Sequence, residues 1–218
     1  MITNTFYNTH PYERSIILID ITRKLTEGIY VYPGDPIFTE KEVFSFSKGD
    51  HYTVTKLSLG THTGTHIDAP AHFIKNGRKI SSYKLDDLCG KAKVFEIREA
   101  EIKKSDLEKS EIECGDIILF KTANSIFDGK IPLKNPAYIS ESAAKYLVSK
   151  KIKLVGIDYI TVDNEASFTS HLIFLNSEIP ILENIDLSSV RPGKYRLYCF
   201  PLNTDTEAAP VRVALEVI

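Results

Sequence analysis

The feature that most constrains this chain is the segment from His62 to His72, which reads HTGTHIDAPAH. It holds three of the six histidines of the sequence and one aspartate, and the residues between them are small, β-branched or uncharged. A glycine, two threonines and a proline disfavour a helix here. We therefore expect an extended chain, in which alternate side chains share one face.

The spacing of the polar residues in this segment predicts a metal site. His62, His66 and Asp68 would share one face of an extended chain, whereas Pro70 is expected to end the strand, so that a turn places His72. Two imidazoles and a carboxylate suit Zn²⁺, Mn²⁺ or Fe²⁺, and three protein ligands leave positions open for water and substrate. A divalent cation can lower the pKa of water to about 7. The alternative is a loop of polar histidines without a metal, which their clustering disfavours.

Short segments rich in β-branched and aromatic residues recur between polar, glycine and proline residues, a pattern typical of strands. A short helix is expected to begin at Ser105 with the capping-box sequence SDLE, another over residues 141–149 capped by Ser140, and a third near 85–88. Because strands outnumber helices, we expect an α/β or α+β class with a sheet-rich core, in one domain over residues 1–218. The expected strands are 16–21, 54–59, 93–97, 117–121, 153–157, 195–201 and 211–217.

The charge balance argues against two classes of partner. The net charge is −2, from 27 basic and 29 acidic residues, and no run of five or more like charges occurs. We therefore expect neither a nucleic-acid surface nor a polybasic membrane patch. The first residues lack the basic region and long apolar stretch of a leader or anchor, and Cys89, Cys114 and Cys199 show no paired spacing. We expect a cytoplasmic protein with reduced, mostly buried thiols.

His171 and Glu183 are two further candidates, at opposite ends of a largely apolar stretch. A carboxylate beside the apolar residues that precede Glu183 needs a partner if it is buried. From periodicity alone, however, we expect each to be a capping or surface residue.

The segment at 62–72 resembles the signature H-x-G-T-H-x-D-x-P-x-H of the bacterial kynurenine formamidase and cyclase family of metal-dependent hydrolases, and it is unbroken here. The resemblance extends along most of the chain. It implies a sheet-rich α/β domain of the swivelling β/β/α type, with a mixed sheet, a few flanking helices, and assembly as a homodimer or homotetramer. Other matching segments are DI at 20–21, PGDP at 33–36, GID at 156–158, VD at 162–163 and PVR at 210–212.

The resemblance also implies roles for the polar residues. His62, His66 and Asp68 would bind one ion, and Asp68 would bridge to a second ion that His171 and Glu183 also hold. Zinc is the expected ion, with one or two per chain, and manganese is the alternative. Imidazole and carboxylate suit several divalent metals, so the ligands alone leave the choice open.

The reaction implied by the resemblance is hydrolysis of an aryl formamide, a small-molecule substrate. In tryptophan catabolism it converts N-formylkynurenine to kynurenine and formate. His72, the last residue of the segment, would act as proton donor and acceptor. Three alternatives stay open: a cyclic amide hydrolase like isatin hydrolase, a cyclase or dehydratase on the same scaffold, and a non-catalytic metal-binding domain.

One position departs from the family pattern. The formamidases carry a tryptophan before P-G-D as the contact for the substrate's ring, whereas this chain has Tyr32 and no tryptophan at all. Tyr32 can still stack on a ring and adds a hydroxyl group, so it is either a substrate contact or an aromatic residue of the turn. The sequence from Tyr32 to Asp35 predicts a type II turn, because Pro33 presets φ and Gly34 accepts a positive φ.

Overall fold

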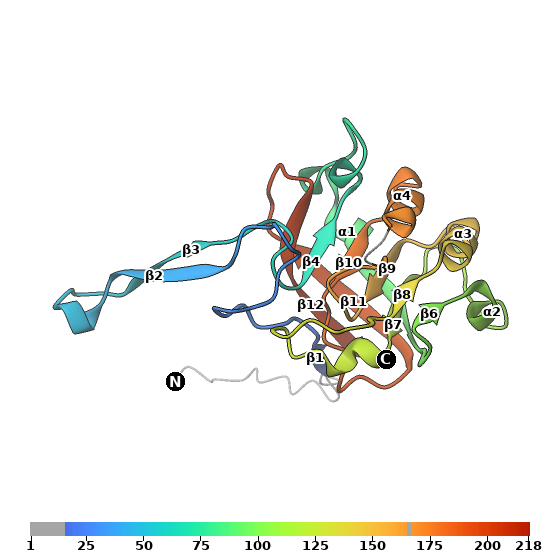
Figure 1. Ribbon diagram of the computed structural model, residues 1–218, viewed down its shortest axis with the longest axis horizontal. Helices are drawn as coiled ribbons and strands as arrows, with labels where there is room; N and C mark the ends of the chain where they lie inside the picture. Colours follow the sequence, from blue (N-terminus) through green and yellow to red (C-terminus); the bar gives the residue numbers. More distant parts are fainter. Residues whose placement is uncertain (1–15, 165–166) are drawn as a thin grey trace, which may run out of the picture.

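A mixed sheet of eight strands forms the centre of the molecule (Figure 1). The structure, a computed structural model, describes residues 16–164 and 167–218. In their order across the sheet, the strands are β1 (Leu18–Asp20), β12 (Ala208–Val217), β11 (Gly193–Pro201), β5 (Gly90–Glu96), β7 (Ile117–Lys121), β9 (Leu154–Ile157), β10 (Ile181–Glu183) and β4 (His66–Asp68). A further ladder joins β4 to β12, so the sheet closes on itself. The block from β5 to β10 is parallel, and the other neighbours pair antiparallel.

Two hydrophobic clusters lie on opposite faces of this sheet. Along β7, Ile117 and Leu119 belong to one cluster, while Ile118 and Phe120 belong to the other. Such alternation follows from the pleat of a strand that is buried on both faces. The first cluster takes side chains from every strand of the closed ring and therefore fills its interior. The second contains side chains of the helices outside the sheet, which are α2 (Lys104–Leu107), α3 (Glu141–Ser149) and α4 (Thr169–Asn176).

A two-stranded ribbon extends away from this body as an arm (Figure 1). It consists of β2 (Thr39–Phe44) and β3 (Val54–Ser58), which pair antiparallel, and every residue of both strands is exposed. A second small sheet, formed by β6 (Glu101–Ile102) and β8 (Tyr138–Ile139), lies beside the helices. A short helix, α1 (Leu85–Leu88), precedes β5.

The architecture confirms the expected sheet-rich α/β class. All the expected strands occur, although β1 is shorter than expected, and α3 spans the expected residues with the hydroxyl of Ser140 accepting from Ala143 N. The helix expected to begin at Ser105 starts at Lys104 instead. The capping-box prediction was wrong there, because the Asp106 carboxylate accepts from Lys103 N at 2.7 Å and so caps this helix from within its first turn.

The expectation of a cytoplasmic protein rested on the cysteines and on the N-terminal residues. The thiols are all free, but only Cys199 is buried; Cys89 is half-buried and Cys114 is exposed, so the expectation of mostly buried thiols was wrong. Residues 1–15, on which the expectation of no leader or anchor rests, lie outside the described residues. Among the residues that the structure describes, no helix combines the length and the apolar character needed to cross a membrane.

Candidate metal centre

The short strand β4 places two of the predicted ligands. It lies between β10 and β12, and the antiparallel register sets His66 opposite Glu183. Because side chains alternate along a strand, Ile67 enters the interior of the closed sheet, while His66 and Asp68 face outward. Glu183 shares the outward face of β10, and His66, Asp68 and Glu183 are all almost fully buried.

His171 reaches the same place from a different element. It lies in the first turn of α4, which packs on the outer face of the sheet. The expectation from periodicity that His171 and Glu183 are capping or surface residues was wrong, since only 4% and 2% of their surfaces are exposed. The apolar residues around both belong to a buried helix and a buried strand, so the polar side chains are carried into the interior with them.

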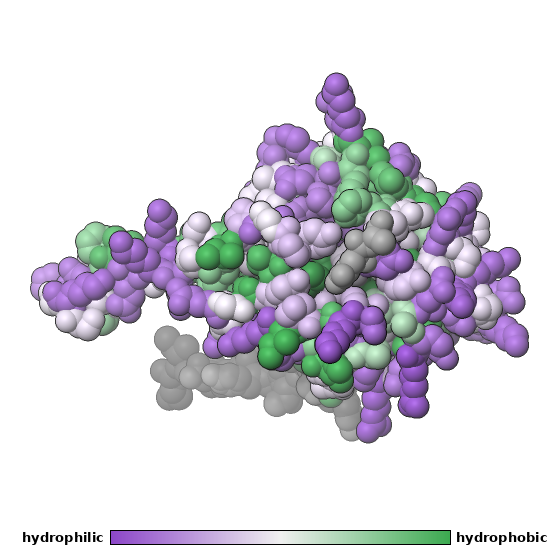
Figure 2. Space-filling model, in the orientation of Figure 1, coloured by the Kyte–Doolittle hydropathy of each residue, from purple (hydrophilic) through white to green (hydrophobic). Residues whose placement is uncertain are grey.

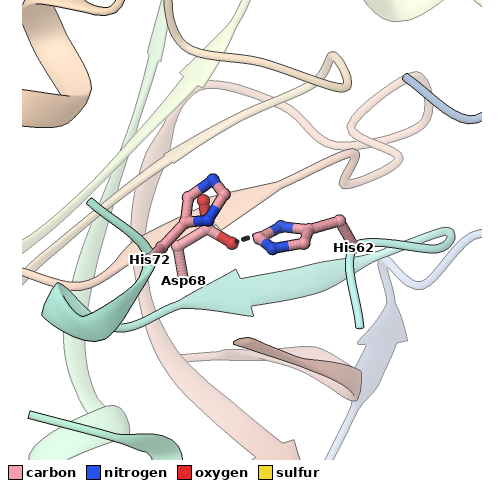
Figure 3. Close-up of side chains that lie close together, drawn as sticks. All are labelled: His62, Asp68 and His72. Atoms are coloured by element: carbon pink, nitrogen blue, oxygen red, sulfur yellow. Dashed lines mark ion pairs between the residues drawn. The ribbon is translucent and has the colours of Figure 1, made fainter. Parts of the chain in front are cut away.

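His62 and His72 approach from outside regular structure. His62 lies in a turn before β4, and His72 lies in a 3₁₀ turn, Pro70–His72, that follows it. Pro70 therefore ends the strand as expected, whereas the expected alternation does not extend back to His62. Figure 3 shows that the side chains of His62 and His72 nevertheless meet at Asp68. Their ring centroids are 4.1 Å apart, and His62 Nδ1 lies 2.9 Å from Asp68 Oδ1.

Two carboxylates and two imidazoles form a closed ring of short contacts. His66 Nε2 lies 3.4 Å from Asp68 Oδ1 and 3.3 Å from Glu183 Oε2. His171 Nε2 lies 3.4 Å from Asp68 Oδ2 and 3.3 Å from Glu183 Oε1. Each imidazole nitrogen thus lies between both carboxylates. The ligand atoms form two groups that share Asp68, one with His66 and Glu183 and the other with His62 and His72.

His66 and His171 are each oriented by a contact of their Nδ1 atom. His66 Nδ1 lies 2.9 Å from the carbonyl oxygen of Gly64, and His171 Nδ1 lies 2.7 Å from Asp163 Oδ2. A carbonyl and a carboxylate can only accept, so in the neutral form of each ring Nδ1 carries the proton and Nε2 has a free lone pair. This is the tautomer that a metal ligand requires.

Gly64 is required by its backbone conformation and by the packing around it. Its φ is +69°, a left-handed conformation that favours glycine, and an added Cβ would lie 2.5 Å from Leu25 Cδ2. Conformation and packing against Leu25 therefore explain this glycine, and its carbonyl then orients His66.

Four buried polar atoms in this cluster lack hydrogen-bond partners among the residues that the structure describes. They are His62 Nε2, His66 Nε2 and both carboxylate oxygens of Asp68. The short approach of His62 Nδ1 to Asp68 Oδ1 does not have the geometry of a hydrogen bond. Buried polar atoms without partners are rare, because each costs about 1–3 kcal/mol. A divalent cation would satisfy both the lone pairs of nitrogen and the carboxylate oxygens, so these residues fit such an ion.

The charges of the cluster shift its pKa values in opposite directions. Burial disfavours a charged His62, but the carboxylate of Asp68 outweighs burial and raises the pKa of His62 to about 9. Burial also disfavours a charged Asp68, but the facing imidazoles of His62 and His66 keep its pKa well below the usual range. Burial, together with the neighbouring His62 and His171, lowers the pKa of His72. The lowered pKa favours the neutral form of His72, which is able to accept a proton.

A cavity of about 250 Å³ opens onto the cluster. Its walls include aromatic side chains from three separate segments, and the rings of Phe73 and Phe168 lie 5.2 Å apart. Tyr32 is in this wall, and its turn forms as predicted, with Gly34 at φ +100° and Asp35 N donating to the Tyr32 carbonyl at 3.0 Å.

Five residues of this site did not emerge from the sequence as candidates. Asp163 belonged to a matching segment but had no role assigned, although its carboxylate holds both the backbone and the ring of His171. Glu207 lies 3.6 Å from His62 Nε2 and nothing near it in the sequence suggested a site. The other three are the aromatic residues of the cavity wall, Tyr30, Phe73 and Phe168, which the sequence pattern does not distinguish from ordinary apolar residues.

Comparisons with known proteins agree on one family. The model of the Cyclase family, described as "Putative cyclase", matches residues 19–164. A kynurenine formamidase of Bacillus cereus is 32% identical over 204 residues, which cover 92% of this chain and 97% of the relative. A kynurenine formamidase of Geobacillus thermodenitrificans is also 32% identical, over 90% of this chain and 96% of the relative.

Solved structures give the same result for the fold. A predicted metal-dependent hydrolase from Bacillus stearothermophilus superposes with a TM-score of 0.81 and 31% identity, over 93% of this chain and 98% of the other. Isatin hydrolase A from Labrenzia aggregata also gives a TM-score of 0.81, over 93% of this chain and 94% of the other, but at 19% identity this likeness concerns the fold alone. The family match, the relatives and the unbroken segment at 62–72 together show that the chain belongs to the Cyclase family of metal-dependent hydrolases.

Proposed function

We propose that this protein is a metal-dependent hydrolase of carbon–nitrogen bonds other than peptide bonds, and that its substrate is an aryl formamide such as N-formylkynurenine. The observation that carries the proposal is the ring of Asp68, His66, Glu183 and His171 at the base of a cavity with aromatic walls. The kynurenine formamidases among its relatives support the reaction class.

Asp68, Glu183 and the Nε2 atoms of His66 and His171 would hold the ion, and His62, whose Nδ1 lies 2.9 Å from Asp68 Oδ1, would add a further ligand. When bound, the ion supplies Lewis acidity toward the amide carbonyl and lowers the pKa of water. Zinc is the ion that we propose, because imidazole and carboxylate ligands suit it, and manganese is the alternative. Asp68 lies against both His62 and His171, so its carboxylate could serve one ion or be shared by two.

His72 is the residue that we assign to proton transfer. Its ring lines the cavity and lies close to the cluster, with its centroid 6.0 Å from that of His171. Hydrolysis of an aryl formamide adds water to the carbonyl carbon, breaks the C–N bond and releases formate and an aryl amine. The departing nitrogen is a poor anion and must gain a proton. A neutral His72 can take a proton from the attacking water and return it to this nitrogen.

The aromatic wall would bind the substrate's ring. Tyr32, Phe73 and Phe168 line the cavity from different segments of the chain, so a flat aromatic group could pack between them. Tyr32 stands where formamidases of the resembling family carry a tryptophan, and we propose that it keeps the stacking role.

Turnover measurements with metal-loaded protein test the proposal. N-formylkynurenine, formanilide and isatin are incubated with protein loaded with zinc or manganese, and amine, formate and isatinate are measured. Release of formate supports the formamidase reaction, and opening of isatin alone would favour a cyclic amide hydrolase. If no compound is hydrolysed with either metal, the hydrolase proposal is wrong, and a cyclase or a non-catalytic metal-binding domain takes its place.

The arm is the element that we propose to join two copies into a homodimer. Its apolar side chains are 40–71% exposed and include Phe44, Phe46, Tyr52 and Leu57, and Figure 2 shows hydrophobic surface near its free end. A two-stranded hairpin on its own is only marginally stable in water. The 20 residues from 39 to 58 also match the roughly 20–30 residues that each partner contributes to a stable interface. A second copy of the chain would cover this surface.

A further inference from the structure

The cavity above the cluster has an uneven distribution of charge. No lysine or arginine is present among the described residues that line it. Apart from the cluster itself, the charged group in the wall is the carboxylate of Asp35. The remaining wall is apolar or aromatic and includes Tyr30, Tyr32, Phe73 and Phe168. A substrate anion would find no lysine or arginine in the described part of this wall, whereas a substrate cation would meet the carboxylate of Asp35.

The position of Asp35 is set by its backbone. The turn that starts at Tyr32 is closed by Asp35 N donating to the Tyr32 carbonyl at 3.0 Å, and Gly34 takes the positive φ that the turn needs. Asp35 is half-buried, yet its carboxylate makes no hydrogen bond or ion pair with any residue that the structure describes. Contacts of the Asp35 carboxylate therefore do not stabilise the turn.

A half-buried carboxylate beside aromatic rings is a favourable place for a cation. The low dielectric of the wall strengthens its attraction to an opposite charge, and the faces of tyrosine and phenylalanine rings attract the same charge. We propose that Asp35 recognises an ammonium group on the substrate, so that the preferred substrate is an aryl amide with a positive charge remote from the bond that breaks. The identity of that bond rests on the proposed function, but the charge preference does not.

Paired neutral and cationic probes test this preference in binding and in turnover. Binding to the metal-loaded protein is measured by calorimetry with 4-(aminomethyl)benzamide and 4-methylbenzamide. Turnover is measured with the corresponding 4-(aminomethyl) and 4-methyl formanilides. We expect the cationic member of each pair to be favoured by about 5- to 20-fold. This is the contribution of a charge-assisted contact, reduced because water partly screens the half-buried carboxylate. The preference should shrink as salt is raised, because salt screens partly exposed charges.

Three variants isolate the carboxylate. Asp35→Asn should abolish the preference for the cationic probes, while Asp35→Glu, which restores the charge, should recover part of it. Asp86→Asn is the matched control, since Asp86 is an exposed carboxylate outside the cavity. Circular dichroism and metal content confirm that each variant is folded and loaded.

The outcomes separate this inference from the proposed function. Equal binding of both benzamides by the unmodified protein would overturn the inference, as would an unchanged preference in Asp35→Asn. Either of these results would overturn the inference even if formanilides are hydrolysed. Conversely, a salt-sensitive preference for the cationic benzamide that Asp35→Asn removes supports the inference, even if no formanilide is cleaved and the proposed reaction fails.

Discussion

Replacing Asp163 by asparagine should weaken metal binding although this residue is not in the ligand cluster. Its carboxylate accepts three hydrogen bonds in the interior of the protein. Ser170 N donates to Oδ1 at 2.7 Å, and His171 donates to Oδ2 from its backbone at 3.1 Å and from its ring Nδ1 at 2.7 Å. The same group therefore caps α4 and sets the tautomer of His171.

Asparagine keeps the shape of this side chain but has one acceptor oxygen. If that oxygen faces His171, the N–H of Ser170 is left against an amide NH₂ group. If it faces Ser170, both donors of His171 lose their acceptor and the ring is free to change tautomer. An unsatisfied buried donor costs about 1–3 kcal/mol of stability. Loss of the partner that orients a ligand histidine typically lowers metal affinity about 10- to 100-fold.

Zinc affinity is measured by competition with a chromophoric chelator, and stability is measured by urea unfolding of the metal-free protein. Asp106→Asn is the matched control, because the Asp106 carboxylate also accepts a backbone N–H at the start of a helix but makes no contact with a histidine among the described residues. We expect the control to keep its zinc affinity. The reasoning is refuted if Asp163→Asn binds zinc within about twofold of the unmodified protein, or if both variants lose affinity equally.

Three further predictions test other parts of the structure. Gly64→Ala should lower the free energy of unfolding by about 2–5 kcal/mol, because it combines an unfavourable φ with overpacking against Leu25. Adding Leu25→Ala should relieve only the overpacking. A loss below about 1 kcal/mol for Gly64→Ala in urea unfolding would contradict the prediction. His72→Ala should keep its metal content while kcat falls about 10²- to 10⁴-fold, and turnover at the unmodified rate would remove His72 from proton transfer. Replacing Phe44 and Phe46 together by serine should convert a dimer to a monomer in sedimentation, and an unchanged mass would place the interface elsewhere.

Local patterns in the sequence were sufficient for much of this protein. The seven expected strands, the helix that Ser140 caps and the turn at Tyr32 follow from preferences of residues that are neighbours along the chain, so they could be predicted without a structure. The segment from His62 to His72 indicated metal chemistry on its own, since its polar residues are too closely grouped for a chance loop. The family resemblance then pointed to His171 and Glu183, which periodicity alone assigned to the surface.

The tertiary structure decided what those residues do together. Closure of the sheet through β4 sets His66 opposite Glu183, and packing of α4 on the outer face brings in His171. Asp163 and Asp35 gain their significance only from what they face in the folded protein. The physical reason is that a sequence pattern reports contacts within a turn or a strand. The meeting of segments about a hundred residues apart depends instead on strand register and on how two hydrophobic faces are buried.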